Sequence, residues 1–431
     1  MQRPVKTGIF YGWVIVLVSF VTLTLVMGSR FTFGVFYPSI LQDTGWSRAA
    51  TAGIFSLSML VYALVALGVG AAFDRLGPRR LFPLAALLLG AGYFLCSQIA
   101  TLWQFYVYYG VIVGIGYTAL GFIPHVSLIS RWFVRRRGLA SSLALSGMGV
   151  GSLIFAPLGE YLIAQYGWRH SYLLYAVLVP GVLIPLILVF YRSDPASLGL
   201  QPDGDAVPPR AHHYAPLASS PVREAPYTAA LRTRAFWALF LVIFTIAFNT
   251  MTLLVHQNQY LVDSGFSQGF AAWMLGLSGI LRSAGSIIWG SISDRTTREG
   301  SFTISAVLGL IAMPCLMSAH AAPEAWRVIL FVLLSGLGYG GTSVLYGTAA
   351  ADLFQGRHFG KILGILDMGF GLGAALGSYL AGVLFDRYQT YHLSFYAVIG
   401  LILVSILSMW LAAPRMARVQ SGALTSSPTE S

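Results

Sequence analysis

Twelve long apolar runs constrain this chain more than any other feature of its sequence. Each run is about 20 residues or longer, the length that an α-helix needs to cross a bilayer core of roughly 30 Å. A membrane-spanning β-strand needs only about 10 residues, so these runs indicate helices. The sequence therefore predicts an all-α membrane protein with twelve transmembrane helices. The expected spans are 10–37, 47–72, 81–100, 104–130, 138–164, 170–191, 234–260, 268–291, 302–320, 325–350, 359–385 and 393–412.

The basic residues predict how the chain is oriented. The net charge is +11, which in a soluble protein would suggest a nucleic-acid partner. Only 10% of the residues are charged, however, and 20 of the 26 Lys and Arg residues fall on the same side of the spans as the amino terminus. Because such an excess marks the cytoplasmic side of a membrane, we expect both termini in the cytoplasm and no nucleic-acid partner. Four basic residues lie on the other side, and Arg30 and Arg282 lie inside spans.

A polar, proline-rich stretch separates the sixth span from the seventh. Prolines and charges at this density are typical of a flexible or loosely ordered linker. The sequence therefore predicts an N-terminal six-helix half at 1–191, a cytoplasmic linker at 192–233, a C-terminal six-helix half at 234–413 and a cytoplasmic tail at 414–431.

The two halves resemble each other in sequence. Gly70, Asp74 and Arg75 after the second span recur as Gly290, Asp294 and Arg295 after the eighth, at an offset of 220 residues. A series of glycines in the fifth span recurs in the eleventh at an offset of 222. Duplicated six-helix units with parallel topology are typical of transporters whose two halves rock about a midplane site. We therefore expect two pseudo-symmetric six-helix bundles.

The segment that follows the second span resembles a known loop signature. The series Gly70-x-x-x-Asp74-Arg75-x-Gly77-x-Arg79-Arg80 is similar to that of the major facilitator superfamily, and the copy after the eighth span is partial. An Asp at a helix end with Arg residues in the next turn can form an ion-pair latch between helices. The residues expected to form this latch are Asp74, Arg75, Arg79, Asp294 and Arg295.

A narrower resemblance starts at Arg131-Trp132-Phe133 and continues through Arg136-Arg137-Gly138-Leu139-Ala140 into the fifth span. With Gly12-Trp13 at the first span, it is similar to the monocarboxylate transporter family, especially its bacterial members and the neighbouring oxalate/formate exchangers. The resemblance implies the major facilitator fold and transport of small carboxylates, commonly with protons. Ser278 stands where eukaryotic members usually carry an Asp, and the eleventh span lacks the Lys of oxalate exchangers. A dicarboxylate is therefore less expected than a monocarboxylate.

Arg282 is the main candidate for binding substrate. It precedes Asp294 by 12 residues, which places it roughly 18 Å from the helix end and close to the bilayer midplane. A charged side chain at that depth costs at least about 2.5 kcal/mol, and a guanidinium can bind a carboxylate through two hydrogen bonds. The resemblance implies the same role, because the family carries an essential Arg in this helix. A structural ion pair with another helix is the alternative.

Further polar residues inside the spans are weaker candidates. Arg30 lies within one residue of where the family carries a substrate-linked Lys, although it could equally extend to the outer surface. Asp367 could carry a proton or form an inner-gate ion pair, and either His125 or His256 could shuttle protons or support helix packing. Tyr62, Tyr117, Asn249 and Tyr346 are expected to orient substrate in the central cavity.

These features together predict a secondary active transporter of a small organic anion. We expect a monocarboxylate carried by alternating access with protons, in a bacterial inner membrane, by a monomer surrounded by lipid. The alternatives are an anion exchanger, an exporter of a hydrophobic compound, or a membrane sensor or scaffold that does not transport. Phosphate-binding loops and metal-ligand spacings are absent from the sequence, so we expect neither an enzyme nor a bound cofactor or metal.

Overall fold

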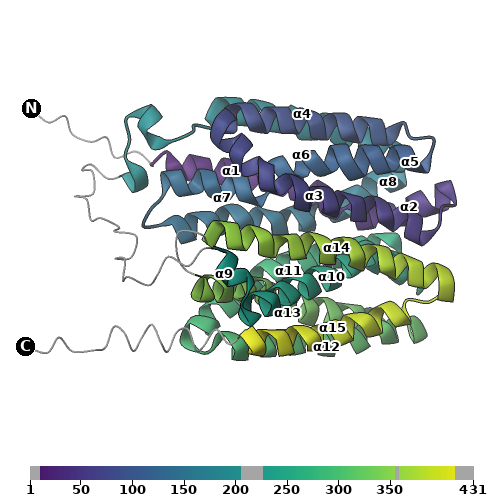
Figure 1. The fold of residues 1–431 in the computed structure, drawn as a ribbon. Coiled ribbons are helices and arrows are strands. Elements are labelled where there is room, and N and C mark those ends of the chain that lie inside the picture. Colours follow the sequence, from purple (N-terminus) through teal and green to yellow (C-terminus); the bar gives the residue numbers. More distant parts are fainter. Residues whose placement is uncertain (1–9, 205–226, 355–358, 413–431) are drawn as a thin grey trace, which may run out of the picture.

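The structure, a computed structural model, describes residues 10–204, 227–354 and 359–412, and within these ranges every regular element is a helix (Figure 1). Most of the linker expected at 192–233 and the tail expected at 414–431 lie outside the described residues.

The first part of the chain is a series of α-helices interrupted by one π-helical segment. In order they are α1 (Gly12–Phe31), α2 (Phe33–Thr44), α3 (Arg48–Leu76), α4 (Pro78–Ser97), α5 (Leu102–Phe105), the π-helix η1 (Tyr106–Val113), α6 (Gly114–Ala119), α7 (Phe122–Trp132) and α8 (Arg137–Phe190).

Three short elements and six long helices make up the rest. The short ones are the 3₁₀ turns η2 (Pro195–Leu198) and η3 (Pro202–Gly204) and the helix α9 (Tyr227–Leu231). The long ones are α10 (Arg234–Asp263), α11 (Gln268–Arg295), α12 (Arg298–Ala321), α13 (Ala325–Leu353), α14 (Phe359–Tyr388) and α15 (His392–Ala412).

The described helices account for twelve membrane crossings. Eleven stretches are long and apolar enough to cross a bilayer. One of them, α8, has 54 residues and reverses at Gly167, where φ is 76° and the backbone is not helical. Because glycine adopts positive φ without steric cost, this position ends the fifth crossing and starts the sixth. The prediction of an all-α membrane protein with about twelve spans is confirmed.

The first and fourth crossings are less regular than the sequence indicated. The apolar run expected at 10–37 is divided at Thr32, whose hydroxyl donates to Ser29 O at 2.7 Å, and it continues to Thr44. The fourth crossing contains the π-helical segment η1 and a second break at Gly121. Discontinuous transmembrane helices and π-helical turns are frequent at functional sites, and both of these crossings carry candidate residues.

The crossings form two bundles that lie side by side. In Figure 1, α1–α8 form one layer and α9–α15 the other, with α3 and α14 adjacent where the layers meet. Each bundle has its own buried apolar cluster, and the first cluster also takes in side chains from α10, α11 and α14. The two bundles are joined mainly through α3 with α14 and α8 with α11. At Gly371 of α14 a side chain would collide with Ala63 of α3, so glycine permits this close approach.

The two ends of the molecule differ in how closely the bundles meet. We call the end that carries η2, η3 and α9 the linker end, and the opposite end, where α2 finishes at Thr44 and α14 at Tyr388, the gate end. Among the described residues, the hydrogen bonds and ion pairs that join the bundles lie between α3 and the gate-end half of the C-terminal bundle. Toward the linker end, side chains added at Gly70, Gly290 and Gly364 would meet nothing within 4 Å. The bundles are therefore closed at the gate end and separated at the linker end.

The outer surface of the described helices is strongly apolar. Leu64, Val177 and Leu407 are 66%, 70% and 66% exposed, and many other large apolar side chains are exposed around them. Water would disfavour such a surface, whereas lipid tails would cover it. This surface agrees with a multi-pass membrane protein.

The first residues after α8 pack against the loop before it. The Asp203 carboxylate accepts hydrogen bonds from the backbone N–H groups of Val134 and Arg135, each at 2.9 Å, and of Arg136 at 3.3 Å. Partial burial of Asp203 opposes its ionisation, but these N–H groups outweigh that effect and lower its pKa below the ordinary range. This part of the linker is therefore ordered on the N-terminal bundle, in contrast to the loose linker that its composition indicated.

Candidate substrate-binding site

Arg30 is a buried cation without an acidic partner among the described residues. It lies in the last turn of α1, just before the break at Thr32, and is 7% exposed. Its Nη2 is 3.3 Å from the sulfur of Met59, and its guanidinium lies 5.4 Å from the ring centre of Tyr62 and 5.3 Å from that of Tyr117. The side chain therefore does not extend to the outer surface. Aromatic faces compensate a buried cation only partly, so the site favours an anion.

Tyr117 is held by other polar groups of the same bundle. Its hydroxyl makes a very short hydrogen bond with that of Tyr93, and the Ser29 hydroxyl also interacts with both tyrosines. Tyr117 follows the π-helical segment of the fourth crossing, which brings it against Arg30. This arrangement fixes the ring of Tyr117 beside the cation.

Arg282 is a second cation without an acidic partner in the described part of the chain. It lies in the middle of α11, and its Nε is buried without a hydrogen-bond partner. Its guanidinium lies 6.0 Å from the ring centre of Tyr339 on α13. Ser278, one turn earlier, donates to Leu275 O of its own helix. The guanidinium of Arg282 is thus free to bind an anion, and an unpaired charge at this depth is costly.

Asp367 is the acid among the candidate residues inside the spans. It lies on α14, closer to the linker end than Arg282 is, and it interacts electrostatically with Tyr62 of α3 and Tyr346 of α13. Tyr62 also packs edge-on against Phe370, one turn after Asp367, with ring centres 6.3 Å apart. Tyr62 therefore lies between Arg30 of one bundle and Asp367 of the other. The Tyr346 hydroxyl is buried without a hydrogen-bond partner among the described residues.

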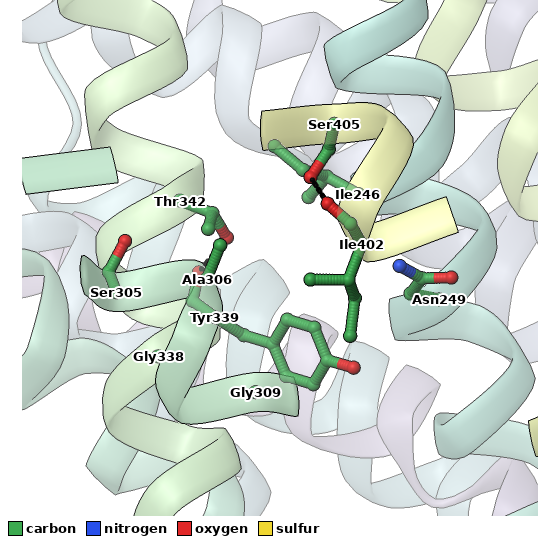
Figure 2. A pocket seen from close by; sticks show the side chains of 10 residues that line it. All are labelled: Ile246, Asn249, Ser305, Ala306, Gly309, Gly338, Tyr339, Thr342, Ile402 and Ser405. Atoms are coloured by element: carbon green, nitrogen blue, oxygen red, sulfur yellow. Dashed lines mark hydrogen bonds between the residues drawn. The ribbon is translucent and has the colours of Figure 1, made fainter. Parts of the chain in front are cut away.

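Asn249 lines a small pocket inside the C-terminal bundle, between α10, α12, α13 and α15 (Figure 2). Figure 2 shows its side chain facing this pocket together with Tyr339, Ile402 and Thr342. The structure therefore brings Asn249 to Tyr339, which in turn lies over Arg282. Asn249 is not placed beside Arg30.

His125 and His256 are both fully buried and both use their two ring nitrogens. His125 is 2.9 Å from Gly121 O through Nδ1 and 3.1 Å from the Tyr191 hydroxyl through Nε2, and all three groups belong to the N-terminal bundle. His256 is 3.1 Å from the Tyr391 hydroxyl through Nδ1 and 2.8 Å from Ser378 O through Nε2. Neither imidazole is in contact with Arg30 or Arg282.

The loop-signature residues make contacts within their own bundles. Asp74 pairs with Arg131 at 2.7 Å, and Arg79 donates to Leu188 O at 2.7 Å. Asp294 pairs with Arg298 at 2.9 Å. These residues lie at the open linker end, and each contact joins two helices of the same bundle, so none of these contacts connects the two bundles. Arg75 and Arg295 form no such contact with another of the described residues.

The gate end is closed by a network that the sequence analysis did not single out. Arg48 at the start of α3 donates to Asp263 of α10 at 2.6 Å and to the Tyr391 hydroxyl at 2.8 Å. The Asp386 carboxylate of α14 accepts from the backbone N–H groups of Arg48 at 2.9 Å and Ala49 at 2.8 Å. We call these five residues the closing network. Because its members come from both bundles, it holds them together at this end.

The fold and these sites together define a class of protein. Two helical bundles enclose unpaired cations at mid-depth, and the bundles meet at one end and separate at the other. This is the arrangement of a secondary transporter that works by alternating access.

Comparison with known proteins identifies the family. The chain matches the model of the Major Facilitator Superfamily over residues 19–348 and 259–429 and belongs to this family. It is therefore a secondary transporter and not an enzyme, and its partners include a transported substrate and the lipid bilayer.

Relatives and a solved structure agree with this assignment. The chain is 28% identical to bovine monocarboxylate transporter 13, over 89% of this chain and 85% of that protein. It is 24% identical to the uncharacterized MFS-type transporter YhjX of Escherichia coli, over 83% and 85%. A bacterial homologue of the human lysosomal transporter Spinster, in an inward-facing and unoccupied conformation, has the same fold, with a TM-score of 0.73 at 16% identity and coverage of 96% and 98%.

Proposed function

We propose that this protein transports a small monocarboxylate together with a proton, and that Arg282 binds the carboxylate. The observation that supports this most directly is the unpaired guanidinium of Arg282 in the middle of α11. A carboxylate can accept two parallel hydrogen bonds from such a group and neutralise its charge. The similarity to bovine monocarboxylate transporter 13 supports the same class of substrate.

Substrate binding would then control the conformational cycle. An unpaired guanidinium is stable only while water or an anion solvates it. Closing the separated linker end around Arg282 therefore costs less when a carboxylate is bound. Asp367, which lies near Tyr62 and Tyr346 on the side of the open end, is our candidate for carrying the proton. Arg30 with its tyrosines provides a second positive centre in the N-terminal bundle.

We further propose that the linker end faces the cytoplasm of a bacterium and that the protein acts as a monomer in the inner membrane. The clustering of 20 of the 26 basic residues on this side supports the orientation. The relative from Escherichia coli supports the bacterial membrane. The conformation described here would then be inward-facing, with the two six-helix halves predicted at 1–191 and 234–413 moving against each other.

Anion exchange is the second candidate function. Arg30 and Arg282 belong to different bundles, and neither has an acidic partner among the described residues. An empty carrier would have to close around both charges, which is unfavourable. A carrier that always returns with another anion avoids that step.

Uptake into proteoliposomes tests these proposals. Labelled lactate and pyruvate would be added outside the proteoliposomes, with and without an inward proton gradient. Each measurement would be made with and without unlabelled carboxylate inside the proteoliposomes. We expect uptake that a proton gradient accelerates, and a loss of roughly 100-fold in Arg282→Ala, because two charge-assisted hydrogen bonds contribute about 3 kcal/mol. Arg169→Ala is the matched control, since Arg169 pairs with Asp43 inside one bundle. Undiminished uptake by Arg282→Ala would contradict the proposed role, and a strict requirement for internal anion without any effect of pH would favour exchange.

A further inference from the structure

A chain of hydrogen bonds connects His256 to the closing network. Arg48 of α3 donates to the hydroxyl of Tyr391 at 2.8 Å, and that hydroxyl lies 3.1 Å from Nδ1 of His256. Nε2 of His256 lies 2.8 Å from the backbone oxygen of Ser378. The ring of Tyr37, from the other bundle, packs edge-on against the imidazole with ring centres 5.2 Å apart. His256 therefore lies directly at the boundary that opens when the bundles separate at the gate end.

The direction of each hydrogen bond in this chain is fixed. Ser378 O is a carbonyl and can only accept, so Nε2 of His256 carries a hydrogen. In a neutral imidazole Nδ1 is then an acceptor, so the Tyr391 hydroxyl donates to Nδ1 while its oxygen accepts from Arg48. A neutral His256 therefore satisfies every donor and acceptor of this chain.

A protonated His256 does not fit this arrangement. Both ring nitrogens of an imidazolium donate, so Nδ1 would compete with Arg48 for the Tyr391 oxygen, and the Tyr391 hydrogen would lose its acceptor. The new positive charge would also lie one hydroxyl group away from Arg48. The nearest acids, Asp263 and Asp386, are already engaged with Arg48 and Ala49.

We propose that His256 is a proton-binding residue that controls the gate end, where protonation opens the closing network. The closed state keeps the imidazole neutral and fully buried, whereas separation of Tyr37 from His256 exposes it to water. Because a proton then binds the open state only, acid shifts the equilibrium toward opening. This inference goes beyond the proposed function, since it concerns the gate end and requires no particular substrate.

Other titratable or charged groups surround His256 on the elements packed against it. They are Tyr37 of α2, Arg48 of α3, Tyr260 and Asp263 of α10, Asp386 of α14, and Tyr391 before α15. Tyrosine and arginine ordinarily titrate at about pH 10 or above, and aspartate at about pH 4. Between about pH 8 and about pH 5.5, histidine is the side chain that ordinarily changes its charge.

The size of the effect follows from this linkage. We take an ordinary histidine pKa of about 6.5 in the open state and no protonation in the closed state. The ratio of open to closed molecules at pH 5.5 is then about 11 times the ratio at a pH where histidine is neutral. We therefore expect a change of about tenfold between pH 8 and pH 5.5.

Distance measurements across the gate end test the proposal. Spin labels would be attached at Gln42→Cys of α2 and Ala325→Cys of α13, two exposed positions on different bundles, in a Cys96→Ala, Cys315→Ala background. The substrate-free protein in nanodiscs would be measured at both pH values. The ratio of the longer-distance population to the shorter-distance population should rise about tenfold at the lower pH. His256→Gln can still accept from Tyr391 and donate to Ser378 O, so it should stay closed at both values.

A matched control uses the other buried histidine. His125 has the same pattern of one backbone oxygen and one tyrosine hydroxyl, but its partners all belong to the N-terminal bundle. His125→Gln should therefore keep the pH response, and His256→Met, a second variant that cannot titrate, should lack it. The proposal is wrong if the distances in the parent protein do not depend on pH, or if His256→Gln responds as the parent does. Since no substrate is present, this result is independent of carboxylate transport.

Discussion

Removing the carboxylate of Asp386 should open the gate end. This carboxylate, from the C-terminal bundle, accepts hydrogen bonds from the backbone N–H groups of Arg48 and Ala49 at the start of α3. It thus caps a helix of the other bundle and interacts favourably with the positive end of that helix. The side chain of Ser47 caps Ala50 in either state, so only the contribution of Asp386 depends on closure. Loss of such a cap costs about 1–2 kcal/mol, which lowers the ratio of closed to open molecules about 5- to 30-fold.

The labels at Gln42→Cys and Ala325→Cys provide the assay for Asp386→Ala. At pH 8, where histidine is ordinarily neutral, the ratio of the longer-distance to the shorter-distance population should rise about 5- to 30-fold. Asp43→Ala is the matched control, because Asp43 makes an ion pair at the same end but with Arg169 of its own bundle. The reasoning would be refuted if Asp386→Ala kept the parent distances, or if Asp43→Ala opened the gate end equally.

Three further predictions test other parts of the structure. Arg30→Met should raise the thermal unfolding temperature by a few degrees while reducing uptake, because a buried unpaired charge is replaced by an apolar side chain; a lower unfolding temperature would contradict this. Gly371→Leu should abolish uptake without preventing membrane insertion, since its side chain would collide with Ala63; normal uptake would show that the bundles need not approach there. The lowered pKa of Asp203 means that its contribution is present above about pH 4 and is lost as the pH falls through the folded-state value. Asp203→Ala should therefore speed hydrogen exchange in the loop before α8 at pH 7, and have little effect at acid pH.

The sequence predicted the parts of the fold that depend on hydrophobicity alone. An apolar run long enough to cross a bilayer has few alternatives to a helix, so the twelve crossings were correctly predicted. The reversal at Gly167 falls in the short gap expected between spans 138–164 and 170–191. The π-helical segment η1 was not predicted, because its residues are as apolar as those in regular helices. The break at Thr32 was not predicted either, although Ser29, Arg30 and Thr32 make that part of the run polar.

The candidate site was only partly accessible from the sequence. Arg30 and Arg282 stand out because a charge inside an apolar run is rare, but whether each has a partner depends on helix rotation. Asn249 was expected to orient substrate in the central cavity, and it lines a small pocket of the C-terminal bundle together with Tyr339. Its role in binding substrate stays a prediction, as do those of Tyr62, Tyr117 and Tyr346.

The closing network was missed for a different reason. In the sequence Arg48 is one of four basic residues on the side of the membrane opposite the termini, and nothing else distinguishes it. Asp263 and Asp386 lie at the ends of spans, where charged residues are common, so they do not stand out either. One available signal was the scarcity of charges on that side. Arg48, Arg169 and Arg327 each pair with an acid there, and among these three only Arg48 pairs with an acid of the other bundle.

The cap that Asp386 places on α3 has a consequence for the opposite conformation. When the gate end opens, the carboxylates of Asp386 and Asp263 withdraw with their own bundle. The first N–H groups of α3 and the guanidinium of Arg48 then face water as a cluster of positive groups, and helix N-termini attract anions. Arg48 and the start of α3, which help to seal one state, thereby become in the other a surface that attracts anionic solutes at the mouth of the pathway.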